Sequence, residues 1–341
     1  MKIKEIADKN FYKKVLIIRF GAIGDVCHTS NVYRSMKKQF PSLDIHYLTS
    51  ELIEPLLRFD PDLNKVWAIN SGQLKPFSKK FVELAKKLKE ENYDLVINLQ
   101  PSLKMLLLAF FAGIKQQAVY KKDFKMHAVD NFWKTAKDKL PEIEHLSSLD
   151  LFLNPDITSE VKGEFAELKR PIFIFNAGGV FAKRQGRTYP LDSWIKLGNE
   201  LQDKYNGTII LTGAREDESF LKPLSQIRDS VYCVGKFSLE KSVALYKEAD
   251  ILISGDSGPL HLASALKTSC IGLFGSMPAN RTGVFSNGIN IVSKKECVPC
   301  NRRKCKFLKK TKELYAPCMC DISTNEILIQ VDKLLDNINA S

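Results

Sequence analysis

The stretch Lys14-Val15-Leu16-Ile17-Ile18-Arg19-Phe20, followed by Gly21-Ala22-Ile23-Gly24-Asp25, decides the fold. Its first seven residues form a short run rich in apolar and β-branched side chains, which predicts a buried strand. A glycine loop ends this strand, and helical and apolar runs then alternate along the chain. Apolar strands that alternate with helices indicate a parallel sheet covered by helices on both faces.

The same plan appears twice, which predicts two domains. In the first half we expect strands at 14–20, 44–48, 66–69 and 94–99, and helices at 31–40, 51–58, 77–90 and from Ser102 onward. In the second half we expect strands at 171–176, 208–212, 231–234, 250–254 and 269–274, and helices at 191–204, 217–228, 238–248, 258–266 and 324–335. The sequence thus predicts an α/β protein of two Rossmann-like, doubly wound domains, residues 1–160 and 161–341, facing a central cleft.

Composition and charge limit the class of protein. With 44% hydrophobic and 26% charged residues, the chain is typical of a soluble globular protein and not of a disordered or fibrous one. The longest apolar stretch, near Met105–Ile114, is too short for a transmembrane helix, and no signal peptide is recognisable, so we expect a cytoplasmic location. A net charge of +12 fits an anionic partner such as a phosphorylated substrate or lipid, but equally a lysine-rich proteome.

The first glycine loop carries one candidate catalytic residue. Its Gly-x-x-Gly-Asp pattern lacks the Gly-x-Gly-x-x-Gly of dinucleotide-binding proteins, and Asp44 begins the second strand instead of ending it. Asp25 follows the loop, where its carboxylate can remove a proton from a substrate hydroxyl. The alternative interpretation is that Asp25 caps the next helix.

The richest segment is Ser254-Gly255-Asp256-Ser257-Gly258-Pro259-Leu260-His261. A buried strand runs into this loop, and Pro259 suits the first turn of a helix. The amino end of such a helix binds phosphate, because its amides are free and its dipole is positive there. Asp256 can bond a ribose hydroxyl or hold the loop, and His261 can point back toward an anion. The alternative is a capped helix with a core histidine.

Two other strand ends of the second domain carry groups that suit a nucleotide diphosphate. Gly178 and Gly179 follow the strand at 171–176, and the nearby cations can neutralise a diphosphate; these are Lys183, Arg184 and Arg187. Glu216 follows the strand at 208–212, where it can bond a ribose or base. Three strand ends of one domain therefore carry groups that suit phosphate.

Several motifs together resemble the family 9 glycosyltransferases, the bacterial lipopolysaccharide heptosyltransferases and their relatives. The resemblance covers nearly the whole chain and rests on four stretches: Val15–Thr29, Tyr93–Gln100, His127–Asp130 and Asp256–Ala263, the last followed by Leu273-Phe274-Gly275. It departs from the family at Ser30-Asn31 and at Asn98-Leu99-Gln100-Pro101, where relatives often read Leu-Pro and Asp-Leu-Gln-Gly. These departures concern the acceptor side.

The resemblance implies a GT-B fold and transfer of a sugar, in particular a heptose from ADP-heptose, to a lipopolysaccharide core or related glycan. It implies inversion without a catalytic metal or cofactor, with Asp25 as the base. The implied donor residues, together with those from the glycine loops, are Gly178, Gly179, Lys183, Arg187, Glu216, Asp256, Ser257, Gly258 and His261. On the acceptor side they are Gly24, His28, Asn98 and Gln100. We therefore also expect an anionic glycolipid as the acceptor, peripheral contact with the inner membrane and no nucleic-acid partner.

A cysteine-rich segment, residues 297–320, has spacing typical of a metal site. It contains Cys297-x-x-Cys300, then Cys305, Cys318 and Cys320. Paired cysteines at this spacing bind structural zinc, but free thiols remain the alternative in a cytosolic protein. Either Cys318 or Cys320 can supply the fourth sulfur.

Two other functions stay open on sequence alone. A nicotinamide-dependent oxidoreductase can use the same fold, although it needs a complete dinucleotide fingerprint. A non-catalytic protein that binds a nucleotide sugar or nucleic acid would not depend on Asp25.

Overall fold

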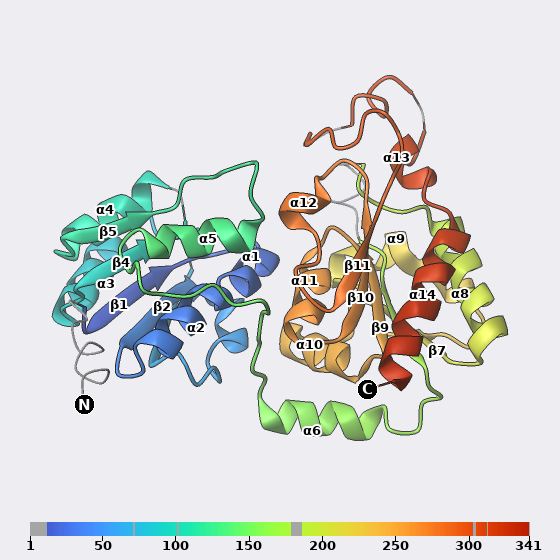
Figure 1. The fold of residues 1–341 in the computed structure, drawn as a ribbon, viewed down its shortest axis with the longest axis horizontal. Coiled ribbons are helices and arrows are strands. Elements are labelled where there is room, and N and C mark those ends of the chain that lie inside the picture. Colours follow the sequence, from blue (N-terminus) through green and yellow to red (C-terminus); the bar gives the residue numbers. More distant parts are fainter. Residues whose placement is uncertain are drawn as a thin grey trace. The chain divides into compact units, whose positions relative to one another are not determined.

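The structure is a computed structural model, and it describes residues 12–70, 72–100, 102–178, 186–302, 305–311 and 313–340. The chain divides into two compact units, Met1–Phe152 and Leu153–Ser341 (Figure 1). Within the described residues, no helix combines the length and the apolar character that a membrane span requires.

The first unit consists of a parallel sheet and its covering helices. Its strands are β1 (Lys14–Ile18), β2 (Asp44–Ser50), β3 (Lys65–Ile69), β4 (Leu95–Asn98) and β5 (Gln116–Val119). Its helices are α1 (Ile23–His28), α2 (Ser30–Gln39), the 3-10 turn η1 (Glu54–Leu56), α3 (Lys79–Glu90), α4 (Leu103–Phe111) and α5 (Ala128–Lys137). The strand order is β3-β2-β1-β4-β5 and every pairing is parallel.

Two apolar layers cover the two faces of this first sheet. On one face, side chains of α2 and α5 such as Tyr33 and Phe132 pack on the strands. On the other, Phe81 of α3 and Met105 of α4 pack beneath Leu16 and Ile18. Because both faces are covered, β1 is apolar along almost its full length, as the sequence predicts.

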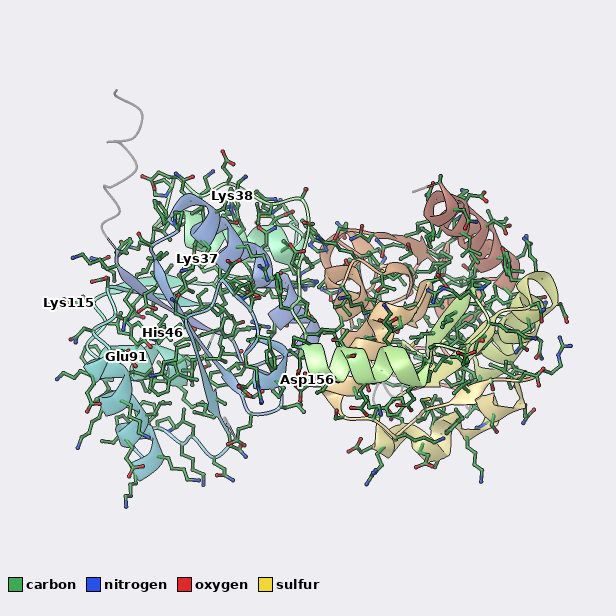
Figure 2. The ribbon with its side chains drawn as sticks, turned by 90° about the horizontal axis from the view of Figure 1, so that it is seen from below. Lys37, Lys38, His46, Glu91, Lys115 and Asp156 are labelled. Carbon is green, nitrogen blue, oxygen red and sulfur yellow. The ribbon has the colours of Figure 1, made fainter. Side chains whose placement is uncertain are left out.

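Charged groups tie together the amino ends of three strands in the first sheet. Glu91, just after α3, bonds Lys14 of β1 at 2.9 Å and Lys65 of β3 at 2.5 Å. His46 of β2 lies beside this pair, with its Nδ1 3.9 Å from the Glu91 carboxylate (Figure 2). This network lies at the strand ends opposite to the glycine loop, so it is structural.

The second unit is a larger parallel sheet. Its strands are β6 (Ile172–Asn176), β7 (Thr208–Thr212), β8 (Val231–Tyr232), β9 (Ile251–Gly255), β10 (Ser269–Phe274) and β11 (Gly288–Val292). Its helices are α6 (Pro155–Glu164), α8 (Leu191–Tyr205), α9 (Glu218–Leu221), α10 (Leu239–Glu248), α11 (Gly258–Ala265), α12 (Ala279–Thr282), α13 (Pro317–Cys320) and α14 (Thr324–Asn339), with 3-10 turns η2 (Arg215–Asp217) and η3 (Lys222–Gln226). The strand order is β11-β10-β9-β6-β7-β8.

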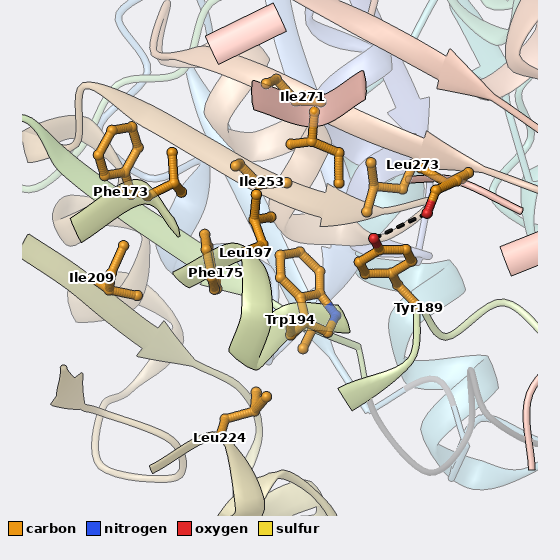
Figure 3. Packing of buried hydrophobic residues seen from close by; sticks show 14 of the residues in the cluster. Phe173, Phe175, Tyr189, Trp194, Leu197, Ile209, Leu224, Ile253, Ile271 and Leu273 are labelled. Atoms are coloured by element: carbon orange, nitrogen blue, oxygen red, sulfur yellow. Dashed lines mark hydrogen bonds between the residues drawn. The ribbon is translucent and has the colours of Figure 1, made fainter. Parts of the chain in front are cut away.

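One large cluster forms the core between this sheet and helices α8 and α14. Trp194 of α8 is fully buried and packs against Phe175 of β6, with ring centroids 4.7 Å apart. Tyr189 meets Trp194 edge to face and donates a 3.0 Å hydrogen bond to the carbonyl of Ile322. Figure 3 shows these rings among the aliphatic side chains of the strands. The cluster fixes β6 and β9, whose ends carry the candidate donor residues.

The main strands occur where the sequence predicts them, but several other elements differ. The sequence places the domain boundary near residue 160, which lies inside α6, whereas the units divide between Phe152 and Leu153. Asn154 caps α6 through a 3.0 Å bond from the amide of Asp156, so a helix follows directly after the division between the units. The predicted helix at 51–58 is only the 3-10 turn η1 here, and the one at 217–228 is divided into the short helix α9 and the 3-10 turn η3, which has Pro223 in its first turn.

Candidate functional site

The glycine loop of the first unit lies at the switch point of its sheet. From β1 the chain goes to β2 on one side, whereas β4 pairs with β1 on the other side. Loops that leave neighbouring strands in opposite directions open a crevice at the carboxyl ends, where doubly wound domains bind ligands. The residues that follow β1 and β4 lie at these carboxyl ends.

Asp25 lies in the first turn of α1 and pairs with Arg19. The N-cap of α1 is Ala22, so the alternative that Asp25 is the helix cap is wrong. Nη2 of Arg19 donates to the Asp25 carboxylate, while Nη1 donates to the carbonyl of Leu99 at 2.5 Å. Arg19 is buried against the Phe132 ring, whereas the Asp25 side chain stays partly exposed. A fixed guanidinium therefore orients a reachable carboxylate.

The candidate acceptor residues gather around the same strand ends. Asn98 ends β4 directly beside Ile18 of β1, and its Oδ1 accepts from the Gln100 amide at 3.1 Å. Oε1 of Gln100 accepts from the Phe20 amide at 3.3 Å, which joins the two loops. Gly24 and His28 are buried in α1. The His28 ring meets the ring of His127, the N-cap of α5, at 5.5 Å.

The switch point of the second sheet lies between β6 and β9. Gly178 follows β6 with φ of +76°, a backbone that favours glycine. The hydroxyl of Ser254, at the end of β9, donates to the Asn176 carbonyl at 2.8 Å and meets the Ser257 hydroxyl at 2.7 Å. Ser257 is the N-cap of α11, yet its side chain bonds Ser254 and no side chain caps the first amides.

Arg187 lies against this loop beside the amino end of α11. Its Nη1 lies 3.4 Å from the Asp256 carboxylate and its Nη2 lies 3.0 Å from the sulfur of Met277. Within the described part of the chain, no acceptor reaches its buried Nε. His261 is buried one turn into α11, with Nε2 3.9 Å from Asp256. Asp256 thus lies between two side chains that can carry positive charge.

The remaining donor candidates are placed less centrally. Glu216 is exposed in η2 after β7, on the side of β6 away from β9. Gly179 and Lys183 lie outside the described residues. The structure therefore brings together Gly178, Arg187, Asp256, Ser257, Gly258 and His261, and it leaves Glu216 at the margin.

The cysteines of the 297–320 segment do not form a ready metal site. A cavity of about 1190 Å³ is lined by four of them, Cys297, Cys300, Cys305 and Cys318, whereas Cys320 is exposed elsewhere. Burial, followed by the charges of the other three thiols, raises the pKa of Cys318 to about 11. Among the described residues, no group of three or more His, Cys, Asp or Glu side chains is arranged to hold a metal ion.

A family model decides the family of the chain. The model of glycosyltransferase family 9 (heptosyltransferase) matches residues 81–152 and 121–311, which together span most of the sequence. The chain belongs to glycosyltransferase family 9. This membership makes it a glycosyltransferase, and it excludes the oxidoreductase and the non-catalytic binding protein that the sequence analysis left open.

Named relatives align with most of this chain. Lipopolysaccharide heptosyltransferase 1 of Campylobacter coli is 25% identical over 307 residues, covering 81% of this chain and 88% of the relative. Lipooligosaccharide heptosyltransferase 2 of Haemophilus influenzae is 26% identical over 310 residues, covering 82% and 88%.

Solved structures share the fold of this glycosyltransferase, which confirms the GT-B class. A family 9 glycosyl transferase from Veillonella parvula superposes with a TM-score of 0.82 at 16% identity, covering 95% of this chain and 98% of the other. Escherichia coli ADP-heptose lipopolysaccharide heptosyltransferase II gives 0.76 at 20% identity, covering 96% and 99%. The iron-containing dodecameric glycosyltransferase TibC of enterotoxigenic Escherichia coli gives 0.57 at 11% identity, covering 96% and 77%.

Sequence reasoning missed two residues that organise the site. Arg19 appears in the sequence only as a charge that interrupts an apolar run, yet it holds Asp25. A charged residue that ends an otherwise buried strand is the signal that could have pointed to it. Ser254 looks like an ordinary strand residue, but its hydroxyl joins the loops after β6 and β9.

Proposed function

We propose that this glycosyltransferase transfers a heptose from ADP-heptose to a lipopolysaccharide core or a related glycan, with inversion and without a catalytic metal. The observation that carries the proposal is the loop at the amino end of α11, with Arg187, Asp256 and His261 around it. The names of the relatives, all lipopolysaccharide or lipooligosaccharide heptosyltransferases, support the donor and the acceptor class.

The donor diphosphate fits the second unit. The first amides of α11 and the positive end of its dipole attract phosphate. Arg187 adds a full charge, and its buried Nε has no hydrogen-bond acceptor among the described residues, so it is available to an anion. Asp256 then holds Arg187 and the loop, or bonds a ribose hydroxyl. We assign Gly178 to close backbone approach and Glu216 to the margin of the same site, and we keep Gly179 and Lys183 as proposed donor contacts.

The acceptor and the base belong to the first unit. Asp25 would deprotonate the acceptor hydroxyl as it attacks the anomeric carbon from the face opposite to the diphosphate, which inverts that carbon. Arg19 keeps the Asp25 carboxylate in one orientation. Gly24 and His28 lie in α1, Asn98 ends β4 and Gln100 follows it, and we propose that these four residues contact the acceptor.

The reaction needs a metal only if the protein itself does not stabilise the negative charge that develops on the leaving ADP. A helix amino end and an arginine supply fixed positive potential where the charge develops, which is the task that a divalent cation performs in other transferases. Enzyme activity in excess chelator is the direct check, and loss of transfer on chelation would contradict this part of the proposal.

A structural zinc ion is a separate proposal for the cysteine-rich segment. Cys297, Cys300, Cys305 and Cys318 line one cavity, so Cys318 and not Cys320 is the fitting fourth sulfur. Binding requires this loop to bring the sulfur atoms closer than they lie here. Metal analysis of the purified chain should find about one zinc per chain. Cys318→Ser should lose it, Cys320→Ser should keep it, and the finding of iron would identify a different metal.

We infer that the enzyme works at the cytoplasmic face of the inner membrane, and its charge and the proposed acceptor class support this location. A net charge of +12 suits an anionic glycolipid layer. Cell fractionation in low and high salt tests this location, and we expect salt to release the enzyme.

Titration calorimetry with ADP, UDP and GDP tests donor binding. We expect ADP to bind most tightly and Arg187→Ala to weaken ADP about 10- to 100-fold, since a charge-assisted contact contributes about 1.5–3 kcal/mol. Arg170→Ala is the matched control, because Arg170 is exposed and pairs with Asp250 at the start of β9. Equal binding of all three nucleotides would contradict the donor assignment.

Catalysis is tested with ADP-heptose and a deacylated core acceptor. We expect Asp25→Asn to lower kcat about 10²- to 10⁴-fold while ADP affinity stays unchanged. Asp138→Asn, an exposed carboxylate at the end of α5, is the control. Normal transfer by the Asp25 variant would remove Asp25 from the mechanism.

A further inference from the structure

Helix α4 is apolar on its outer face as well as its inner face. Met105, Leu108 and Ala109 point into the core beneath the first sheet. On the other side, Leu103 is 72% and Phe110 71% exposed, seven residues apart and therefore on one stripe. Apart from Lys104, every residue of α4 is apolar, and a helix of this composition is normally buried in protein or lipid. Among the described residues, nothing covers this outer stripe of α4.

Aromatic rings from the neighbouring helix extend the stripe. Helices α3 and α4 lie side by side on one face of the first sheet (Figure 1). Phe77, just before α3, is 66% exposed, and its ring meets that of Phe111 at 5.7 Å. Phe110 and Phe111 are also 5.7 Å apart. Together with the exposed Val82 of α3 and Leu103 of α4, we call these rings the aromatic face.

The backbone at Phe77 is a second, independent sign of function. Its φ is +62°, in the left-handed region that glycine or asparagine usually occupies and that a bulky residue avoids. Local strain of this kind persists at functional positions, where the surroundings hold it. Here the strained residue is an exposed aromatic, although a glycine would fit the turn better and a polar residue would suit water.

Lysines surround the aromatic face. The segment from Lys75 to Lys115 contains eight lysines and four acidic residues. The exposed lysines include those of the outer surface of α3 and the one after α4, namely Lys75, Lys79, Lys80, Lys86, Lys87, Lys89 and Lys115. A second copy of this face would place lysine against lysine. An anionic surface with an apolar interior fits both the charges and the rings.

We propose that the aromatic face binds the headgroup region of an anionic phospholipid bilayer, with Phe77, Leu103 and Phe110 entering the apolar boundary. Exposed apolar patches of this size commonly mark interaction sites. The choice of a lipid surface rests on the proposed function, whose glycolipid acceptor is anchored in a membrane. Binding through this face would keep the first unit, which carries Asp25, at the membrane surface where the acceptor lies.

Vesicle flotation tests the proposal on the full chain. The enzyme is mixed with vesicles of phosphatidylglycerol and phosphatidylethanolamine, or of phosphatidylcholine alone. We expect it to float with the anionic vesicles and to be released by salt. The double variant Leu103→Ser/Phe110→Ser should bind roughly tenfold more weakly or worse, since each large apolar side chain contributes strongly to partitioning. Phe124→Ser removes another exposed phenylalanine of the same unit and should float normally.

A fluorescent reporter follows insertion directly. We expect the emission of Phe110→Trp to shift to the blue on anionic vesicles and to be quenched by brominated lipid, whereas Phe124→Trp should respond to neither. Thermal unfolding of each variant checks that it is folded. Absence of flotation by the wild-type enzyme would overturn the proposal. Equal loss of vesicle binding in Leu103→Ser/Phe110→Ser and in Phe124→Ser would also overturn it.

The outcomes separate this surface from the proposed chemistry. Transfer to a deacylated, soluble acceptor needs no membrane, so the double variant should retain it in full. Vesicle binding without any heptose transfer would refute the proposed function and keep the lipid surface. A concentration-dependent dimer that the double variant abolishes would assign the face to a second copy of the chain and overturn the lipid proposal.

Discussion

Arg19 makes two directed contacts at once, and we propose that together they orient Asp25. Its guanidinium donates to the Asp25 carboxylate and to the Leu99 carbonyl, from a buried position over the Phe132 ring. Lysine keeps the charge but is a single point donor that cannot form this fork. We expect Arg19→Lys to lower kcat about tenfold or more with ADP affinity unchanged, since misplaced bases lose rate steeply.

The readout that separates positioning from simple unfolding is the comparison of kcat with KM and with thermal stability. A folded Arg19→Lys enzyme with a lowered kcat and an unchanged donor KM supports positioning. If kcat stays normal, Arg19 is only a structural ion-pair partner of Asp25.

Glu91 gives the first unit a stability that depends on pH. Hydrogen bonds from Lys65 and then Lys14 lower the Glu91 pKa from 4.5 to about 2. Because the pKa is lower in the folded state, the stabilisation is fully present above pH 4.5 and is lost as the pH falls toward 2. We expect Glu91→Gln to cost about 1 kcal/mol at pH 7, as for a partly exposed ion pair, and progressively less below pH 4.5.

Urea unfolding at several pH values measures this difference. Glu90→Gln, which alters the exposed neighbour, is the control. A cost for Glu91→Gln that stays constant from pH 7 to below 3 would show that the lysine pairs do not provide the stability.

At the residue scale, loop chemistry was readable from the sequence and long-range partners were not. Asp25, Asp256 and His261 lie in or just after glycine-rich segments that follow apolar strands, which predicts proximity to strand ends. The partners Arg19–Leu99 are 80 residues apart, and Arg187–Asp256 are 69 apart. Such contacts depend on which strands become neighbours, and the order of strands is not encoded locally.

At the scale of elements, the loop from β9 into α11 is held by one hydroxyl. Ser254 bonds the Asn176 carbonyl of β6 and the Ser257 side chain, so it fixes the helix start relative to Gly178. Loss of a buried hydrogen bond typically costs about 1–2 kcal/mol. We expect Ser254→Ala to lose this stability and, in addition, to weaken ADP several-fold, because the helix start is no longer held.

Helix α11 itself offers the control for this prediction. The hydroxyl of Ser264, near the other end of the helix, is equally buried and donates to the Ser286 carbonyl at 2.7 Å. Ser264→Ala should lose similar stability but bind ADP as the wild type does, as titration calorimetry would show. Equal ADP affinity in both variants would mean that the loop needs no such fixation.

Elements with a strong apolar pattern were predictable, and weakly patterned ones were not. The central strands and α3, α8, α10 and α14 occur close to their predicted positions. The edge strand β5 contains Gln116 and Gln117, and β11 begins at Gly288, so neither reads as a buried strand. Helix α1 contains Gly24 next to the glycine loop, which hides its helical pattern.

At the scale of the whole molecule, each unit has its own core. The clusters around Phe81 and Phe132 belong to the first unit, and the cluster around Trp194 belongs to the second. Two separate cores permit separate unfolding, because a domain with its own apolar core is a cooperative unit. The repeated alternation of strands and helices made this duplication predictable from the sequence.

Calorimetry of the full chain should therefore resolve two transitions that respond to different changes. ADP at about 100 times its Kd contributes about 2.7 kcal/mol to the domain that binds it. For a domain of this size, that corresponds to a rise of roughly 5–10 °C in Tm. We expect ADP to raise only the transition of the second unit, whereas Glu91→Gln should lower only that of the first. A single transition that moves as a whole under both changes would show that the two units unfold together, because stabilisation of one would then extend to the other.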